Sequence, residues 1–136
     1  MDVRQMLATH LPGGEHPSGS LARCIEEAYS CAQACTACAD ACLGEPALAG
    51  LRECIRSNLD CANICNATGA IATRQTGGNM ILVIEVINAC ALACRLCGDE
   101  CERHAGRLSY CRICAVACRR CEEACSEAIT ALREGY

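Results

Sequence analysis

The sequence predicts an all-α protein, an antiparallel up-down-up-down four-helix bundle with a short extra N-terminal helix. All seventeen cysteines fall into four runs, at residues 24–42, 54–65, 90–101 and 111–125, and each gap within a run is three, four or seven residues. These gaps place side chains along one face of an α-helix. Glycine and proline between the runs break the chain into separate helices.

The helix ends are expected at these breaking residues. Gly44 follows the first main helix, and Pro46 suits the first turn of the second. Residues 76–78, followed by Asn79 as a cap, separate the second helix from the third, and residues 105–106 separate the third from the fourth. Because short loops join antiparallel neighbours, the four helices are expected to alternate in direction.

The N-terminal segment is expected to form a separate small element. Residues 2–9 predict a short helix, and a linker rich in proline and glycine follows. The predicted organisation is an N-terminal helix and linker, residues 1–19, and one bundle domain, residues 20–136, since the chain is long enough for a single buried core.

Composition excludes several classes of partner. The formal net charge is −4, with mixed signs throughout, so the sequence offers neither a basic surface for nucleic acid nor an acidic tail. We expect a cytoplasmic protein without a membrane span, because no secretory pattern and no run of about 20 apolar residues is recognisable. An odd number of cysteines in a reducing compartment argues against a disulfide framework.

A core lined by so many thiols predicts a metal cargo. Soft thiolates select Cu(I), zinc or iron-sulfur clusters. Zinc and iron-sulfur sites gather four ligands around one point, whereas the stripe from Cys24 to Cys42 continues over about 27 Å of helix. Cu(I) suits such a tube, because it accepts two or three thiolates and balances their charge. The expected capacity is on the order of one ion per cysteine.

The candidate ligands follow from the same spacing. Cysteines at i and i+4 form helix-borne Cys-x-x-x-Cys pairs, which are Cys31 with Cys35, Cys38 with Cys42, Cys61 with Cys65, Cys90 with Cys94, Cys97 with Cys101, Cys114 with Cys118, and Cys121 with Cys125. The bridging or terminal ligands are Cys24, Cys54 and Cys111. His104 is expected at the thiol-lined mouth of the bundle, either as a ligand for incoming Cu(I) or as a partner of the carbonyl groups at the helix end.

The antiparallel arrangement also predicts two different bundle ends. The inward positions beyond the last cysteines are apolar or small at the end opposite the mouth, and they are Leu21, Thr68, Ala72, Met80, Val83, Ile87, Ala128 and Leu132. Asn58 interrupts the stripe of the second helix, either as a structural amide or as a ligand. Residues 80–87 are apolar nearly all round, which indicates a further contact such as another subunit.

The chain resembles the cytosolic branch of the copper storage protein family, through CAQACTACADACLGE, LRECIRSNLDCANIC, CALACRLCGDECERHAG and YCRICAVACRRCEEAC. The resemblance implies many Cu(I) ions bound by Cys-x-x-x-Cys pairs, a homotetramer, and metal uptake at the open bundle end, where His104 matches the family's mouth histidine. It implies storage and buffering rather than an enzymatic reaction. An iron-sulfur or thiol redox protein and a zinc-stabilised structural bundle remain the alternatives.

Overall fold

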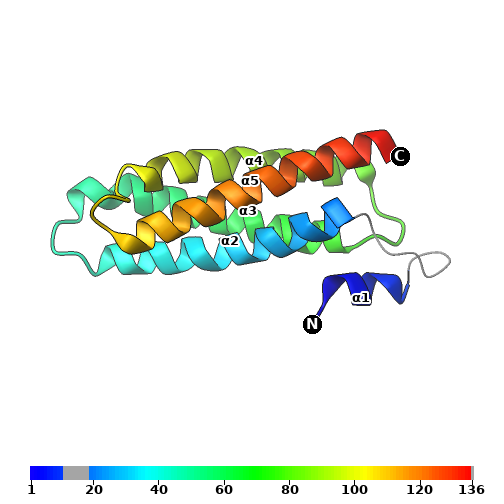
Figure 1. Ribbon diagram of the computed structural model, residues 1–136, viewed down its shortest axis with the longest axis horizontal. Coiled ribbons are helices and arrows are strands. Elements are labelled where there is room, and N and C mark those ends of the chain that lie inside the picture. The colour runs from blue at the N-terminus through cyan, green and yellow to red at the C-terminus, as the bar shows by residue number, and fades with distance from the viewer. Residues whose placement is uncertain (11–18, 136) are drawn as a thin grey trace.

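The computed structural model describes residues 1–10 and 19–135, and this part of the chain is helical without a β-strand. The helices, shown in Figure 1, are α1 (Val3–Ala8), α2 (Gly19–Leu43), a 3₁₀ turn η2 (Ala49–Leu51), α3 (Arg52–Thr73), α4 (Met80–Glu102) and α5 (Ser109–Gly135). The predicted all-α class is confirmed. The linker expected before residue 19 lies mostly outside the described residues.

The four long helices form a closed ring of neighbours. Helix α2 packs against α3 and α5, and α4 packs against the same two helices. The connections alternate between the two ends of the bundle, so successive helices run in opposite directions (Figure 1). The ring leaves one inward face on every helix, and these faces meet along the bundle axis.

The predicted start of the second main helix at Pro46 is wrong. Residues 44–48 form an irregular loop, the 3₁₀ turn follows, and α3 begins at Arg52. The amide N–H of Leu51 donates to the carbonyl of Leu48 at 2.9 Å, and the Leu51 side chain is buried. A proline is compatible with a first turn but does not compel one. Burial of Leu51 instead decides where the chain enters the bundle.

Two predicted helix starts agree with the structure. Asn79 caps α4, with its side-chain oxygen accepting from the amide N–H of Leu82 at 3.2 Å. Asp2 caps α1 in the same way through the amide N–H of Arg4, at 2.8 Å. Both caps satisfy amide groups that have no partner within the first turn of a helix.

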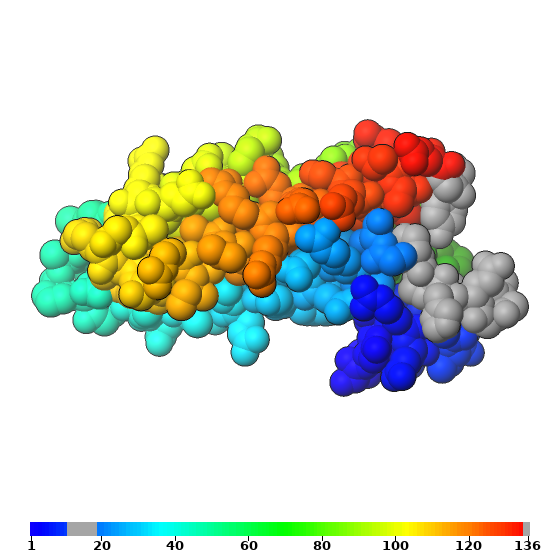
Figure 2. Space-filling model, in the orientation of Figure 1, coloured from blue at the N-terminus to red at the C-terminus, as the bar shows by residue number. Residues whose placement is uncertain are grey.

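The end of the bundle opposite the cysteine-rich loops is closed by apolar side chains. Leu21, Ile87 and Leu132 are each at most 2% exposed, as expected from the sequence. Met80 is only partly buried. Helix α1 adds the fully buried Leu7 to this end, and it lies beside α2 in Figure 1 and against the bundle surface in Figure 2.

Helix α4 contradicts the expectation that no segment has the length and apolar composition of a membrane span. By length and composition alone, residues Met80–Glu102 are long and apolar enough to cross a membrane. The mean hydropathy of their most apolar window is 2.0. Core helices of globular proteins pass the same test, and the inward face of α4 carries four buried cysteines. Only 33% of that window is buried in the structure. Much of the apolar surface of α4 therefore faces outward.

Arg119 ties α5 to α4 outside the core. Its guanidinium contacts Asp99 at 2.6 Å and Glu102 at 2.9 Å. It lies over Gly98, where an added Cβ would come within 3.0 Å of the guanidinium carbon. The missing side chain at residue 98 thus lets the arginine cross between the helices and hold their relative register.

Candidate metal-binding core

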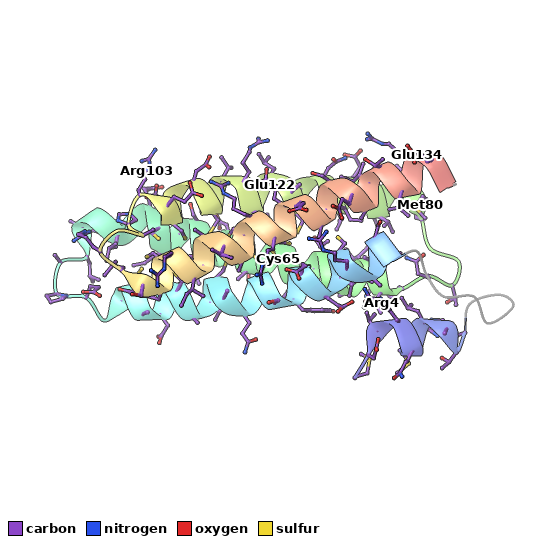
Figure 3. The ribbon with its side chains drawn as sticks, in the orientation of Figure 1. Arg4, Cys65, Met80, Arg103, Glu122 and Glu134 are labelled. Carbon is purple, nitrogen blue, oxygen red and sulfur yellow. The ribbon has the colours of Figure 1, made fainter. Side chains whose placement is uncertain are left out.

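All seventeen predicted cysteines point into the bundle as free thiols. Each is at most 1% exposed, because the three- and four-residue gaps keep them on the inward stripe of their helices. Figure 3 shows Cys65 within the bundle, whereas Arg103, Glu122 and Glu134 lie on its outer surface. The sulfur atoms therefore fill a space that leucine or isoleucine would fill in an ordinary helical bundle.

Some thiols meet along one helix, as the spacing predicts. The Sγ atoms are 3.8 Å apart in Cys31 with Cys35, 3.8 Å in Cys61 with Cys65, and 4.0 Å in Cys97 with Cys101. At these separations, two sulfurs can turn toward one two-coordinate ion.

Close sulfur contacts also run between helices, and they outnumber those along one helix. Cys31 on α2 lies 3.9 Å from Cys94 on α4 and 3.8 Å from Cys118 on α5. Cys65 on α3 lies 3.7 Å from both Cys90 and Cys94 on α4. The predicted picture of pairs on single helices is therefore incomplete, because sulfurs such as those of Cys31 and Cys65 have neighbours on two or three helices.

These contacts build overlapping groups of sulfurs. In each group the Sγ atoms all lie within 4.8 Å of one another, and the groups include Cys31, Cys65, Cys94 and Cys121; Cys31, Cys35, Cys61 and Cys118; Cys35, Cys97, Cys114 and Cys118; Cys38, Cys101 and Cys114; and Cys38, Cys42, Cys54 and Cys111. Several cysteines belong to two groups. The groups consequently join into a continuous path of sulfur from the middle of the bundle to its mouth.

Asn58 lies inside this path and is fully buried. Its side-chain oxygen accepts from Cys97 and Cys114, each at 3.1 Å, and more distantly from Cys101 at 3.6 Å. Its amide nitrogen donates to Cys54 at 3.5 Å. The side chain therefore has partners on both polar atoms, as a buried amide requires. These contacts favour the structural interpretation of Asn58.

The mouth of the core lies at the bundle end that carries the loops after α2 and α4 (Figure 1). We define the mouth group as Cys38, Cys42, Cys54 and Cys111, whose sulfurs lie within 4.8 Å of one another. His104 follows the end of α4, and its side chain is 12% exposed. Its Nε2 atom is buried without a hydrogen-bond partner and lies 3.7 Å from a Glu100 carboxylate oxygen.

The thiols of the mouth group differ in acidity. Hydrogen bonds from Cys101 and Cys38 lower the pKa of Cys54 to about 3, and the charge of His104 acts in the same direction. Burial raises the pKa of Cys111 to about 12 and also raises that of Cys42. The mouth group therefore combines one thiol of lowered pKa, Cys54, with thiols of raised pKa.

Deeper in the core, acidity alternates between neighbouring thiols. Hydrogen bonds from Cys118, Cys121 and Cys35 lower the pKa of Cys31. The pKa of Cys118 is raised, first by its hydrogen bond with Cys114. Such a network releases protons from some thiols before others. Each metal ion that binds there displaces protons, since the thiolate is the ligand.

Two residues at the mouth were missed by the sequence reasoning. Glu100 precedes His104 by one helical turn, a spacing that could have identified it as a neighbour of the imidazole. The hydroxyl of Tyr110 donates to Glu45 at 2.6 Å and thereby holds the loop after α2 against α5. No local pattern could have indicated this contact between residues 65 positions apart.

Comparisons with known proteins agree with the cysteine-lined core. The chain is 50% identical to the Streptomyces lividans copper storage protein Ccsp loaded with 10 copper equivalents, with a TM-score of 0.85 and coverage of 93% of this chain and 97% of that one. A form of the same cytosolic protein with five coppers is 56% identical, with a TM-score of 0.80 and coverage of 82% and 92%.

Two further comparisons concern family membership. The chain is 36% identical over 81 residues to the uncharacterized cysteine-rich protein YhjQ of Bacillus subtilis. The aligned residues make up 60% of this chain and 71% of that protein. The family model described as copper storage protein matches residues 18–130, which include all four cysteine runs. The chain therefore belongs to the copper storage protein family.

Proposed function

We propose that this protein stores and buffers many Cu(I) ions in the cytosol, with the seventeen core cysteines as ligands and no reaction of its own. One observation carries the proposal: neighbouring sulfurs lie 3.7 to 4.0 Å apart over much of the buried core. A thiolate that bridges two Cu(I) ions needs sulfur neighbours on more than one side, and the contacts between helices provide them. The copper-loaded Streptomyces relatives support the same conclusion.

The charge of the core favours a monovalent cargo. One Cu(I) ion per thiolate leaves the filled core neutral, and a neutral core avoids the cost of burying uncompensated charge. In the described part of the chain the core cysteines are buried, and their side-chain hydrogen-bond partners are other thiols and Asn58. A core packed with divalent ions and four thiolates each would instead accumulate negative charge.

His104 is proposed as the residue that receives Cu(I) at the mouth. Its Nε2 atom is unpartnered, and its charge acts on Cys54 of the mouth group. An imidazole nitrogen is an acceptable Cu(I) ligand but a weaker one than thiolate, so an ion that it captures would move on to the sulfurs. His104 would thereby affect the rate of loading more than the capacity.

The storage proposal is tested by titrating the reduced protein with Cu(I) under anaerobic conditions beside a chromophoric chelator. We expect saturation on the order of seventeen ions per chain. Cys35→Ser should remove one or a few ions, while the exposed Gln33→Ala on the same helix serves as the matched control and should leave capacity unchanged. Saturation at one or two ions, or preferential uptake of iron, would favour a redox protein instead.

We also propose that the chain forms a homo-oligomer, a tetramer by resemblance to the family. The outward face of α4 supports the assembly, because Ile81, Leu92 and Leu96 are 78%, 46% and 55% exposed. Leu92 and Leu96 line a groove of about 220 Å³ between α3 and α4, together with Ile64. Exposed apolar side chains around such a groove mark an interaction surface, and a second copy offers the same apolar surface in return.

The oligomer is tested by light scattering after size-exclusion chromatography. A chain mass of 14.4 kDa makes monomer and tetramer easy to distinguish. Leu92→Glu combined with Leu96→Glu should reduce the measured mass, whereas Gln33→Glu on the exposed face of α2 should not. An unchanged mass in the double variant would place the contact on another face.

A further inference from the structure

We propose that the mouth group also binds one divalent ion that favours four thiolate ligands, with Zn(II) as the physiological example. The site consists of Cys38 and Cys42 from α2, Cys54 from α3 and Cys111 from α5. It differs from the proposed Cu(I) storage in metal, charge and stoichiometry, and it concerns one position of the core only.

The geometry of the mouth group suits a tetrahedral ion. A zinc–sulfur bond of about 2.3 Å places neighbouring sulfurs about 3.8 Å apart in a regular tetrahedron. The Sγ atoms of Cys38 and Cys111 are 3.8 Å apart, and all four sulfurs lie within 4.8 Å of one another. Because the ligands come from three helices, they can surround an ion.

Local electrostatics distinguish this group from the deeper ones. Zinc with four thiolates has a formal charge of −2, which is costly in an apolar interior. Cys54 is the third residue of α3, and Cys111 is the third residue of α5. Both ligands therefore lie in the first turn of a long helix, where the helix dipole stabilises negative charge, whereas Cys42 lies in the last turn of α2, where the dipole acts in the opposite direction. Cys31 and Cys121, in contrast, lie near the middle of their helices.

His104 supplies an unpartnered polar atom at the same end of the bundle. Its Nε2 atom is buried without a hydrogen-bond partner, at 3.7 Å from a Glu100 carboxylate oxygen. The mouth is also the end of the core at which the helices open into loops, so the remaining charge lies closest to water (Figure 1).

A divalent ion at this position would occupy the path by which Cu(I) reaches the deeper sulfurs. Cys38 belongs both to the mouth group and to the group with Cys101 and Cys114, which leads inward. Cu(I) would displace the ion, because thiolates bind Cu(I) more strongly than Zn(II). The mouth would then remain closed to weaker-binding metals and open to copper.

The test uses Co(II) as a spectroscopic substitute for Zn(II), added anaerobically to the reduced full-length protein. We expect one Co(II) per chain with the absorption of tetrahedral thiolate coordination, and displacement of that absorption by one Zn(II). Cys54→Ser and Cys111→Ser should each weaken binding by at least about tenfold and change the spectrum. The matched controls Cys31→Ser and Cys121→Ser should bind Co(II) as the wild type does, and circular dichroism should show equal helix content in all variants.

Three results would overturn the proposal: no stoichiometric Co(II) binding by the wild type, more than one ion per chain, or equal loss of binding in the Cys31→Ser and Cys121→Ser controls. A separate Cu(I) titration distinguishes this failure from failure of the storage proposal. A protein that binds many Cu(I) ions but no Co(II) would retain the storage function and lack the divalent site. A second readout is the release of one Zn(II) per chain as Cu(I) is added.

Discussion

The two ends of the bundle are formed by the same four helices but by different inward side chains. At the closed end, Leu21, Ile87 and Leu132 pack with Leu7 of α1 into an apolar cluster. At the mouth, the inward positions are thiols, and His104 follows the end of α4 at the same end of the bundle. Large aliphatic side chains bury more apolar surface than cysteine. The closed end is therefore expected to supply stability, while the sulfur-lined region supplies binding capacity.

The largest expected effect is a loss of stability at the closed end. Ile87→Ala removes a fully buried side chain and leaves a cavity, which should lower the free energy of unfolding by about 2–5 kcal/mol. Denaturant unfolding of the metal-free protein measures this change, and Cu(I) capacity should remain that of the wild type. The matched variant Cys94→Ala, in the core, should show the reverse pattern: a smaller loss of stability and a reduced capacity.

The next effect is a pH dependence of stability, which is expected from the mouth thiols and not from the apolar side chains of the closed end. Burial raises the pKa of Cys42, and that of Cys111 to about 12, from an ordinary value of 9.0. Between about pH 9 and 12 the unfolded chain loses protons that these folded thiols keep, so the stability of the metal-free protein should fall as pH rises. Urea midpoints at about pH 8 and about pH 10.5 measure the change.

A control sharpens the pH comparison. Cys111→Ala removes one of the thiols with a raised pKa and should reduce part of the loss of stability above pH 9, whereas Ile87→Ala should leave the pH dependence unchanged. Equal pH dependence in Cys111→Ala and the wild type would contradict the assignment of the effect to the mouth.

A smaller effect is expected at Asn58, between the two regions. Asn58→Ala removes the oxygen that accepts from Cys97 and Cys114, and should cost about 1–3 kcal/mol in the metal-free protein. Asn58→Cys restores the cysteine stripe of α3 and should raise capacity by about one Cu(I). Unfolding and Cu(I) titration measure these changes. A fall in capacity for both variants would instead identify the Asn58 oxygen as a ligand.

The smallest equilibrium effect is expected for His104. His104→Ala should leave the final Cu(I) capacity unchanged and slow its uptake, because the imidazole lies beside the mouth thiols rather than among the deeper sulfurs. Stopped-flow mixing with a Cu(I)–chelator complex measures the rate, and His10→Ala in the N-terminal segment is the control. An unchanged rate in His104→Ala would remove the histidine from the uptake path.

The features of the fold that could be predicted are those that depend on residues close together in the sequence. The four helical runs, the inward position of the cysteines and the Asn79 cap were predictable, because each depends on residues within about one helical turn of one another. The start of α3 was not, because burial of Leu51 in the assembled bundle outweighs the local preference of Pro46.

The candidate site divides in the same way. Pairs such as Cys31 with Cys35 could be predicted, since one helix fixes their separation. The contacts of Cys31 with Cys94 and Cys118 could not, because they depend on the axial register of three helices. The same register brings Cys97 and Cys114 to the oxygen of Asn58. A shift of one helix by a single turn, about 5.4 Å, would exchange every partner.

The sequence by itself determined that this chain forms helices with one thiol-lined face and that the thiols meet in a core suited to a soft metal. Periodicity suffices for this, because helical geometry converts spacing directly into a face. Only the tertiary structure decided which sulfurs share an ion-sized space, where Asn58 finds its partners, and that two mouth thiols lie in the first turns of α3 and α5. These properties arise from the packing of helices against each other, which no single helix encodes.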